Sequence, residues 1–188
     1  GGIELGYGSD LDLVFIHAMD EQADTDGKKP ISGFEFAMRV AQKFMSLMTT
    51  QTLDGRVYEI DTRLRPSGEA GLLVTSFKAF EQYQFKSAWV WEHQALVRAR
   101  SIAGENSLCQ DFEQLRCRIS TQVRDEGMVR DEVIKMRQKM KAHLGSSKEQ
   151  QKDGIFHLKQ DAGGIVDIEF MAQYAVLAWS GSNHDLAH

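Results

Sequence analysis

Apolar and polar side chains alternate one by one in two segments near the start of the chain. Residues 9–15 read SDLDLVF, and residues 57–65 read VYEIDTRLR. An alternation of period two is typical of a strand with one buried face, so both segments predict β-strands. Residues 72–74 form a third, short candidate strand. Pro66 cannot donate a main-chain hydrogen bond, and we expect it to end the second strand.

Helical spacing dominates the rest of the chain, and serines mark where helices can begin. Ser32 and Glu35 have the spacing of a capping box. An apolar stripe of helical period follows them: Phe36, Ala37, Val40, Ala41, Phe44, Leu47 and Met48. Ser76 and Ser87 are candidate N-caps, the second of a helix over residues 88–103. Further helices are predicted over residues 108–119, 129–144 and 165–179, and a strand over residues 155–159.

Strands dominate the first part of the chain and helices the remainder, which indicates an α+β protein. We expect a small mixed sheet that carries acidic residues at one edge, with helices packed behind it. The predicted boundary lies near Gly104 and separates a domain over residues 1–104 from a mainly helical region over residues 105–188. Both ends interrupt recognisable patterns, so we expect a piece of a longer polypeptide whose first domain is truncated at its N-terminus.

The composition is that of an ordinary globular protein and excludes several classes. Of 188 residues, 42% are hydrophobic and 26% charged, and the net charge is −5. No apolar run approaches the ~18–20 residues that a membrane span needs, so we expect no membrane contact. The net acidity argues against binding to nucleic acid. With no visible signal peptide, we expect a cytoplasmic protein.

Asp10 and Asp12 are the first candidates for a functional site. On a strand, residues i and i+2 point to the same face, about 6.5–7 Å apart. Asp61 on the second strand is the candidate third carboxylate. Three oxygen ligands suit Mg²⁺ or Mn²⁺, with phosphate oxygens in the remaining positions. A lone D-x-D usually marks a solvated strand edge, but here apolar neighbours surround the acids on both strands, which favours a metal site.

Glycines and arginines near these acids suit phosphate groups. Gly1, Gly2 and the Gly-Tyr-Gly-Ser segment that ends at Ser9 allow main-chain N–H groups to approach a polyphosphate closely. Arg63 and Arg65 share a strand face with Asp61 and can hold phosphate charge.

In these same residues the chain resembles a known family. The glycine pair, six residues and SDLDLVF are similar to the signature of the polymerase-beta-like nucleotidyltransferase superfamily. Four longer strings resemble the glutamate-ammonia-ligase adenylyltransferase family: GGIELGYGSDLDLVF, YEIDTRLRPSGEAGLLVTS, AWVWEHQALVRAR and GGIVDIEFMAQY. The resemblance implies a polymerase-beta-like catalytic domain over residues 1–104. It also implies metal-binding catalytic carboxylates at Asp10, Asp12 and Asp61, and nucleotide contacts at Gly1, Gly2, Ser9, Arg63 and Arg65.

The resemblance further implies a Mg²⁺- or Mn²⁺-dependent enzyme that uses ATP. The family carries two related nucleotidyltransferase domains: one attaches AMP to a tyrosine of glutamine synthetase, and the other removes it by phosphorolysis as ADP. The SDLDL and IDTR strings resemble the attaching domain. We therefore expect AMP transfer to a tyrosine hydroxyl with release of pyrophosphate, in the regulation of nitrogen assimilation. Control of the full-length enzyme by a PII-type signalling protein and by glutamine is also implied.

Two alternatives stay open: the related adenylyl-removing domain, and a non-catalytic module that binds a nucleotide or a partner. Four charged residues of the later helices are also left unassigned. Arg98 can contact phosphate or pair with Glu92. Asp167 and Glu169 open the last predicted helix, where acidic residues suit the helix dipole, but they also lie in a family string.

Overall fold

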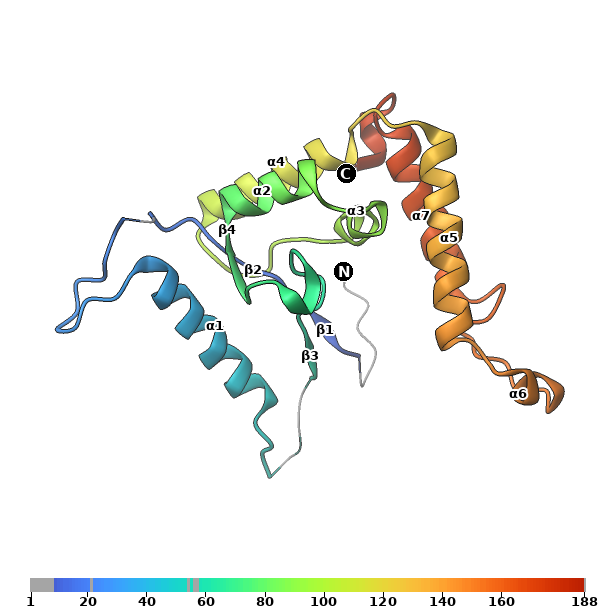
Figure 1. Cartoon of the computed structure of the whole chain (residues 1–188), viewed down its shortest axis with the longest axis horizontal. Helices are drawn as coiled ribbons and strands as arrows, with labels where there is room; N and C mark the ends of the chain where they lie inside the picture. Colours follow the sequence, from blue (N-terminus) through green and yellow to red (C-terminus); the bar gives the residue numbers. More distant parts are fainter. Residues whose placement is uncertain (1–8, 21, 54, 56–57, 188) are drawn as a thin grey trace. The chain divides into compact units, whose positions relative to one another are not determined.

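The chain was analysed as a computed structural model, which describes residues 9–20, 22–53, 55 and 58–187 (Figure 1). The described residues form two compact units. Unit 1 draws on Gly1–Ala88 and Ser101–Phe112, and unit 2 on Trp89–Arg100 and Glu113–His188. The boundary expected near Gly104 stays a prediction, because a compact unit need not be an independently folding domain.

Unit 1 contains two separate pairs of parallel strands. β1 (Leu11–Asp12) pairs with β3 (Ile60–Asp61), and β2 (Phe15–His17) pairs with β4 (Val74–Ser76) (Figure 1). The expected mixed sheet is therefore wrong for the described residues, since both pairs are parallel and neither joins the other. The broader prediction of an α+β protein is confirmed, because the chain is mostly helical and contains two small sheets.

The strands are shorter than their alternating patterns predict. The segment over residues 9–15 divides between β1 and β2. β3 ends at Asp61 because the chain then turns: the Arg65 N–H donates to the Thr62 carbonyl (3.2 Å), and the Gly68 N–H donates to the Arg65 carbonyl (2.8 Å). A 3₁₀ turn, η1 (Gly68–Ala70), follows. The strand expected over residues 57–65 is thus wrong beyond Asp61, and residue 57 lies outside the described residues.

Two capped helices pack on the strands of unit 1. α1 (Gly33–Thr49) begins after Ser32, whose side chain accepts from the Glu35 N–H at 3.2 Å, so this N-cap is confirmed. α2 (Phe77–Lys86) begins after Ser76 in the same way, with the Ala79 N–H as donor. Ala37 and Ala41 of α1 pack with Val74 of β4, and Phe15, Met38 and Leu73 surround them.

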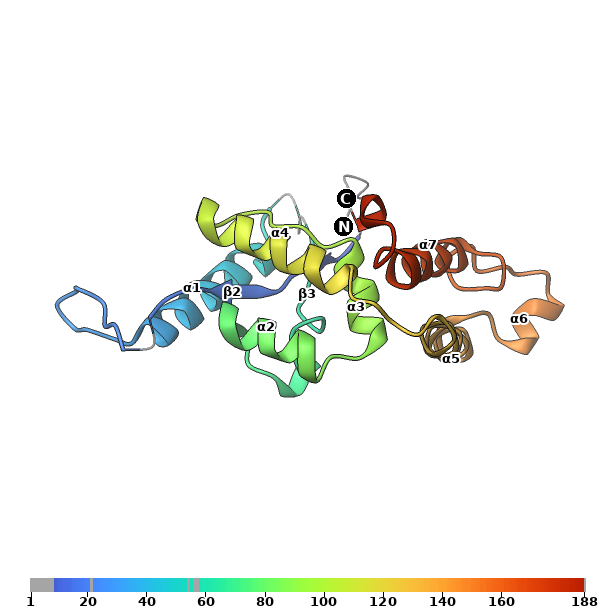
Figure 2. The same ribbon diagram turned by 90° about the horizontal axis from the view of Figure 1, so that it is seen from above.

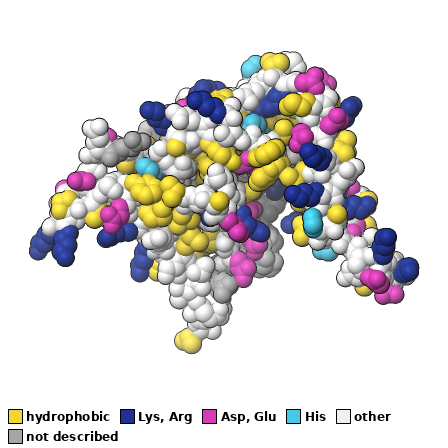
Figure 3. Space-filling view, in the orientation of Figure 1, with side chains coloured by type: hydrophobic (Ala, Val, Ile, Leu, Met, Phe, Trp, Pro, Cys, Tyr) yellow, Lys and Arg dark blue, Asp and Glu magenta, His cyan; other side chains and the backbone are white. Residues whose placement is uncertain are grey.

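The large apolar side chains of α1 lie largely outside this core. Phe36, Val40 and Leu47 are 42%, 52% and 63% exposed, and apolar side chains gather over the α1 region in Figure 3. Phe44 packs edge-on against Phe15, with ring centroids 5.9 Å apart. The helical prediction for this stripe is correct, but only its small alanines are buried.

Unit 2 is helical. Its main helices are α3 (Val90–Val97), α5 (Glu126–Leu144) and α7 (Ile165–Trp179), and α5 lies beside α7 in both ribbon views (Figures 1 and 2). α4 (Asn106–Ser120) begins in unit 1 and ends in unit 2, and α6 (Lys148–Lys152) and η2 (His184–Ala187) are short. The core consists of Val129, Val133 and Leu177, packed against Val90, Val97, Phe170 and Tyr174. The predicted helices over residues 108–119, 129–144 and 165–179 are confirmed.

Two predictions for unit 2 are wrong. The helix expected over residues 88–103 is limited to α3, because Ser87 closes α2 by donating its N–H to the Tyr83 carbonyl (2.8 Å). Residues 155–159 form turns and irregular chain rather than a strand. Over the part of the chain that the structure describes, no helix has both the length and the apolar content that crossing a membrane requires.

Candidate active site

The parallel pair β1–β3 brings two of the candidate carboxylates together. Asp12 is in register with Asp61, and main-chain hydrogen bonds of 2.8 Å fix this register, from Leu11 to Glu59 and from Leu13 to Asp61. Neighbouring strands lie about 4.8 Å apart, and residues in register share a face, so the two aspartates are close neighbours. Asp10 lies immediately before β1 in the chain.

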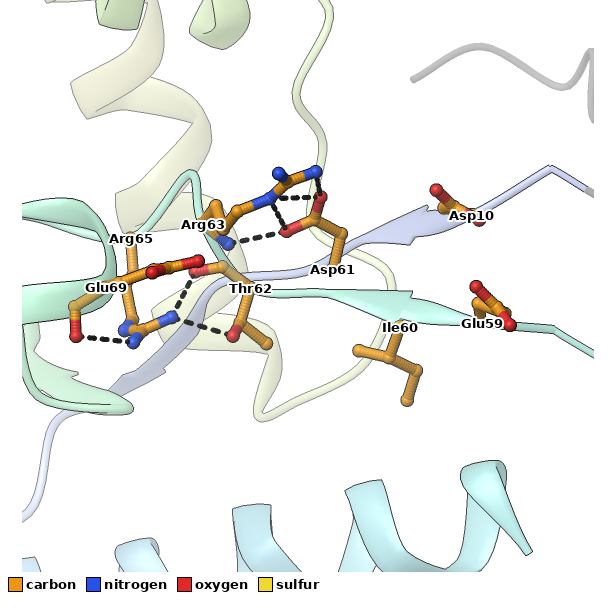
Figure 4. Close-up of a pocket in the computed structure, with 8 residues that line it drawn as sticks. All are labelled: Asp10, Glu59, Ile60, Asp61, Thr62, Arg63, Arg65 and Glu69. Carbon is orange, nitrogen blue, oxygen red and sulfur yellow. Dashed lines mark hydrogen bonds and ion pairs between the residues drawn. The ribbon is translucent and has the colours of Figure 1, made fainter.

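An open pocket of about 460 Å³ lies beside this strand pair (Figure 4). Its lining is almost wholly polar and consists of Asp10, Glu59, Ile60, Asp61, Thr62, Arg63, Arg65 and Glu69. Four carboxylates face two guanidiniums, which leaves a net charge of −2 on the lining. The volume suits a small-molecule ligand. An acidic lining would repel a polyphosphate unless cations bind with it.

Asp61 is held by Arg63, two residues further along the chain (Figure 4). The Arg63 N–H donates to Asp61 Oδ1 (2.8 Å), and Nε donates to Oδ1 (3.0 Å) and Oδ2 (2.8 Å). Nη2 donates to Oδ2 as well. These hydrogen bonds, the side-chain ones foremost, lower the pKa of Asp61 below its ordinary value, although partial burial opposes them. Asp61 is therefore ionised, in the form that binds a cation.

Arg65 lines the same pocket, but its guanidinium is hydrogen-bonded to the turn after β3. It donates to the carbonyls of Thr62 (2.8 Å), Glu69 (3.1 Å) and Gly71 (3.2 Å), and to the Thr62 hydroxyl (2.8 Å). The turn needs this support because Ser67 adopts a left-handed φ of 62°, which a side chain disfavours. Arg65 thus shapes the pocket wall, and its contact with phosphate stays a prediction.

The donor chemistry of the site fits a hard divalent cation. Carboxylate oxygens from Asp10, Asp12 and Asp61 are the ligands that Mg²⁺ and Mn²⁺ prefer. Within the described ranges, however, no three acidic, histidine or cysteine side chains are already grouped as a metal site. The Asp61 oxygens in particular are occupied by Arg63. Metal binding by these residues therefore stays a prediction that requires a local rearrangement.

The expected phosphate loop is only partly visible. Gly1 and Gly2 lie outside the described residues, and Ser9 is half-buried just before β1. The sequence analysis did not identify Thr62 and Glu69 as pocket residues. The Pro-Ser-Gly turn after Arg65 is the local signal that could have found Glu69, because it folds the chain back beside β3.

The four unassigned charged residues all make structural contacts within unit 2. The Glu92 carboxylate accepts from the Trp89 N–H (2.8 Å) at the start of α3. Arg98 pairs with Glu169 (2.5 Å), which joins α3 to α7 and is neither of the partners considered for it. Asp167 accepts from the Gly163 N–H (2.6 Å) and from Arg137 of α5, and these bonds lower its pKa.

Asp161 is a structural residue that the sequence analysis missed. It is buried in the segment that leads into α7, and it accepts from the Ser146 N–H (2.8 Å), the Ser146 hydroxyl (2.7 Å) and the His157 N–H (2.7 Å). These hydrogen bonds lower the pKa of Asp161 to about 2. A single aspartate between two predicted helices carries no pattern that distinguishes it.

Comparisons with known proteins agree with the strings identified in the sequence. Residues 1–115 match the sequence model of the family Glutamate-ammonia ligase adenylyltransferase. The chain is 85% identical, over all of its residues, to 20% of the bifunctional glutamine synthetase adenylyltransferase/adenylyl-removing enzyme of Acinetobacter baylyi. Proteins of the same name from Pseudomonas aeruginosa and Mannheimia haemolytica are each 53% identical, over 97% and 100% of this chain and over 20% and 19% of their own lengths.

The chain thus spans about a fifth of the length of the curated relatives it matches. The family match covers more than half of the chain and includes all the strands of the pocket. The chain belongs to the glutamate-ammonia ligase adenylyltransferase family.

Proposed function

We propose that this chain is an adenylyl-attaching domain, which transfers AMP from ATP to a tyrosine hydroxyl of glutamine synthetase and releases pyrophosphate. The observation that carries the proposal is the register of Asp12 opposite Asp61, beside a polar pocket, in a chain of this family. Asp61 lines this acidic pocket and Asp12 is its partner in register, and such a group of carboxylates suits a cation-bound triphosphate. The names of the relatives supply the protein substrate.

In the proposed reaction the tyrosine oxygen attacks the α-phosphorus of ATP. The new O–P bond forms as the bond between the α-phosphorus and the oxygen bridging to the β-phosphate breaks, and the hydroxyl proton passes to solvent. Asp10, Asp12 and Asp61 would hold Mg²⁺ or Mn²⁺, which would neutralise phosphate charge and stabilise the entering and leaving oxygens. Arg63 would neutralise charge on the departing pyrophosphate, and Gly1, Gly2 and Ser9 would cradle it. Positioning and charge neutralisation supply most of the catalysis in such transfers.

Adenylyl removal is a second candidate, because the relatives are named for both activities and this chain spans a fifth of them. In that reaction inorganic phosphate would attack the same phosphorus, and the tyrosine oxygen would leave. Control by a PII-type protein and by glutamine is proposed only for the full-length enzyme.

A two-direction assay tests the proposal. The chain is incubated with ATP, Mg²⁺ and unmodified glutamine synthetase, and the mass increase of one AMP is measured together with pyrophosphate. In parallel, adenylylated glutamine synthetase is incubated with phosphate, and ADP is measured. We expect AMP attachment and no ADP. ADP alone would assign the removing activity, and neither product would indicate a non-catalytic module.

Asp12→Asn provides the site-specific test, because it keeps the shape of the side chain and removes its charge. We expect AMP transfer to fall by at least about 100-fold, the scale on which single charge-stabilising groups act in catalysis. Asp131→Asn is the matched control, since Asp131 is an exposed aspartate of α5 in unit 2. Equal activity of the two variants would contradict the proposal.

A further inference from the structure

Most of the acceptor capacity of the Asp61 carboxylate is taken by Arg63. A carboxylate offers about four acceptor sites on its two oxygens. Arg63 makes four contacts through three donors: its main-chain N–H to Oδ1, Nη2 to Oδ2, and Nε, whose single hydrogen is shared between Oδ1 and Oδ2. Three of these four contacts come from the guanidinium. A cation that binds both Asp61 oxygens would therefore have to displace the Arg63 guanidinium.

The guanidinium is placed so that leaving costs little. The Arg63 side chain is 69% exposed, whereas that of Asp61 is 15% exposed. An ion pair with one solvent-exposed partner is weak, because water competes for the exposed charge. Arg63 also lines the pocket on the side where Asp61 lies, so the freed guanidinium stays within reach of a ligand there (Figure 4).

Arg65 cannot make the same exchange. Its guanidinium is bound to three main-chain carbonyls and one hydroxyl of the turn that it supports. These hydrogen bonds go to the turn rather than to the Asp61 carboxylate, although both residues line the pocket. The two arginines therefore line the same pocket but differ in what their guanidiniums bind.

We propose that Arg63 is an exchangeable counter-ion of Asp61: it occupies the carboxylate while the cation is absent, gives it up when a divalent cation binds, and then contacts the phosphates of the nucleotide. This inference rests on the proposed function, because it deepens the role of the same site. It couples the two ligands, since the cation that displaces Arg63 also frees the group that holds the phosphate. The Arg63 guanidinium is then available to the nucleotide phosphates only when the cation is bound.

The test measures two affinities in the same variants. Mn²⁺ binding without nucleotide is followed by the electron paramagnetic resonance of free Mn²⁺, and ATP binding with Mg²⁺ is followed by calorimetry. Arg63→Met removes the competing guanidinium, so we expect Mn²⁺ to bind about threefold to fivefold tighter, the range that an exposed ion pair supports. The same variant should bind ATP with Mg²⁺ about tenfold more weakly, because a charge-assisted phosphate contact is lost. A general loss of positive charge would produce the same two signs, so Arg63→Lys, which keeps the charge, is needed to separate exchange from a change in charge.

Arg39→Met is the control: Arg39 is an exposed arginine of unit 1 whose ion pair is with Glu35, outside the pocket lining, so the variant removes the same charge without freeing Asp61. We expect its Mn²⁺ affinity to stay near that of the wild type, and a tightening equal to that of Arg63→Met would overturn the inference. Arg63→Lys keeps the charge but loses the forked geometry, so its Mn²⁺ affinity should fall between those of the wild type and Arg63→Met. This variant decides the question if either methionine variant fails to fold.

The outcomes separate this inference from the proposed function. Mn²⁺ binding that Asp61→Asn weakens and Arg63→Met leaves unchanged would overturn the exchange and leave the proposed function standing. If no variant binds Mn²⁺, with or without ATP, both fail, because there is then no cation site at these acids.

Discussion

Gly71 follows the turn after β3, and that turn leaves no room for a side chain. Its φ of −83° and ψ of 163° are accessible to any residue, so the cost of an alanine there is steric. A Cβ at this position would lie 1.9 Å from the Pro66 carbonyl oxygen, 1.5 Å inside the 3.4 Å at which ordinary contact begins. Because the obstructing atom belongs to the main chain, no side chain can rotate away. Gly71→Ala must open the turn.

The contacts of Arg65 set the size of the effect. Its guanidinium donates to the Gly71 carbonyl (3.2 Å) and to the Glu69 carbonyl (3.1 Å), on the segment that must move. Hydrogen bonds from a charged donor contribute about 1.5–3 kcal/mol each, and less where water has access. We therefore expect Gly71→Ala to lower the free energy of unfolding of unit 1 by about 2–4 kcal/mol. The wall of the pocket, which includes Arg65 and Glu69, should change with it.

The assay must report on unit 1, and tryptophan fluorescence does not. All three tryptophans, Trp89, Trp91 and Trp179, belong to unit 2. Hydrogen exchange over residues 58–76, read by mass spectrometry, follows the turn and β4 directly. A loss of 2–4 kcal/mol corresponds to exchange that is about 30-fold to 1,000-fold faster. Gly27→Ala is the control, because a Cβ there meets no atom within 4 Å. Equal exchange in the two variants would refute the steric argument.

Two further predictions concern unit 2. Leu177 is 0% exposed and packs with Val129, so Leu177→Ala should lower the free energy of unfolding by about 2–5 kcal/mol. Tryptophan fluorescence during urea unfolding measures this loss. Ile168→Ala is the control, because the Ile168 side chain is 63% exposed and its removal should change the urea midpoint little. Equal midpoints for Leu177→Ala and Ile168→Ala would contradict the assigned core. The pKa of Asp161 is lowered to about 2, so its contribution to stability is complete above the ordinary carboxyl pKa and is lost as the pH falls from about 4 toward 2. The urea midpoint should therefore drop less between neutral and acidic pH in Asp161→Asn than in the wild type, and an equal drop would show that Asp161 is not the group responsible.

Local signals predicted the helices well. Ser32 and Ser76 cap α1 and α2 because a serine hydroxyl satisfies a main-chain N–H within three residues, an interaction that the sequence contains in full. Strands were harder because a strand needs a partner. Residues 155–159 carry apolar side chains, but none of the strands that the structure describes pairs with them, and Ile155, Phe156 and Leu158 are 52–67% exposed. Alternation alone therefore predicted a strand that does not form.

The candidate site was predictable in its residues but not in its contacts. The alternation in the two acidic strands placed Asp12 and Asp61 on faces that the parallel register brings together. The same alternation placed Arg63 and Arg65 on one face as equivalent phosphate ligands. The turn after Asp61 separates them: Arg63 folds back onto Asp61, and Arg65 binds the turn itself. Sequence spacing predicts which residues meet on a regular strand, but it does not show where the strand stops.

The parallel pairing of β1 with β3 also determines when the site can form during folding. Asp12 and Asp61 are in register although they lie far apart along the chain. A tight turn cannot connect two parallel strands. The intervening chain, with α1, must fold back first, so the two carboxylates meet late and only in the folded unit. A ligand that bridges both strands would bind the folded state alone. At a hundred times its dissociation constant it would add about 2.7 kcal/mol to the stability of unit 1, so occupancy of the site would help to keep its own scaffold folded.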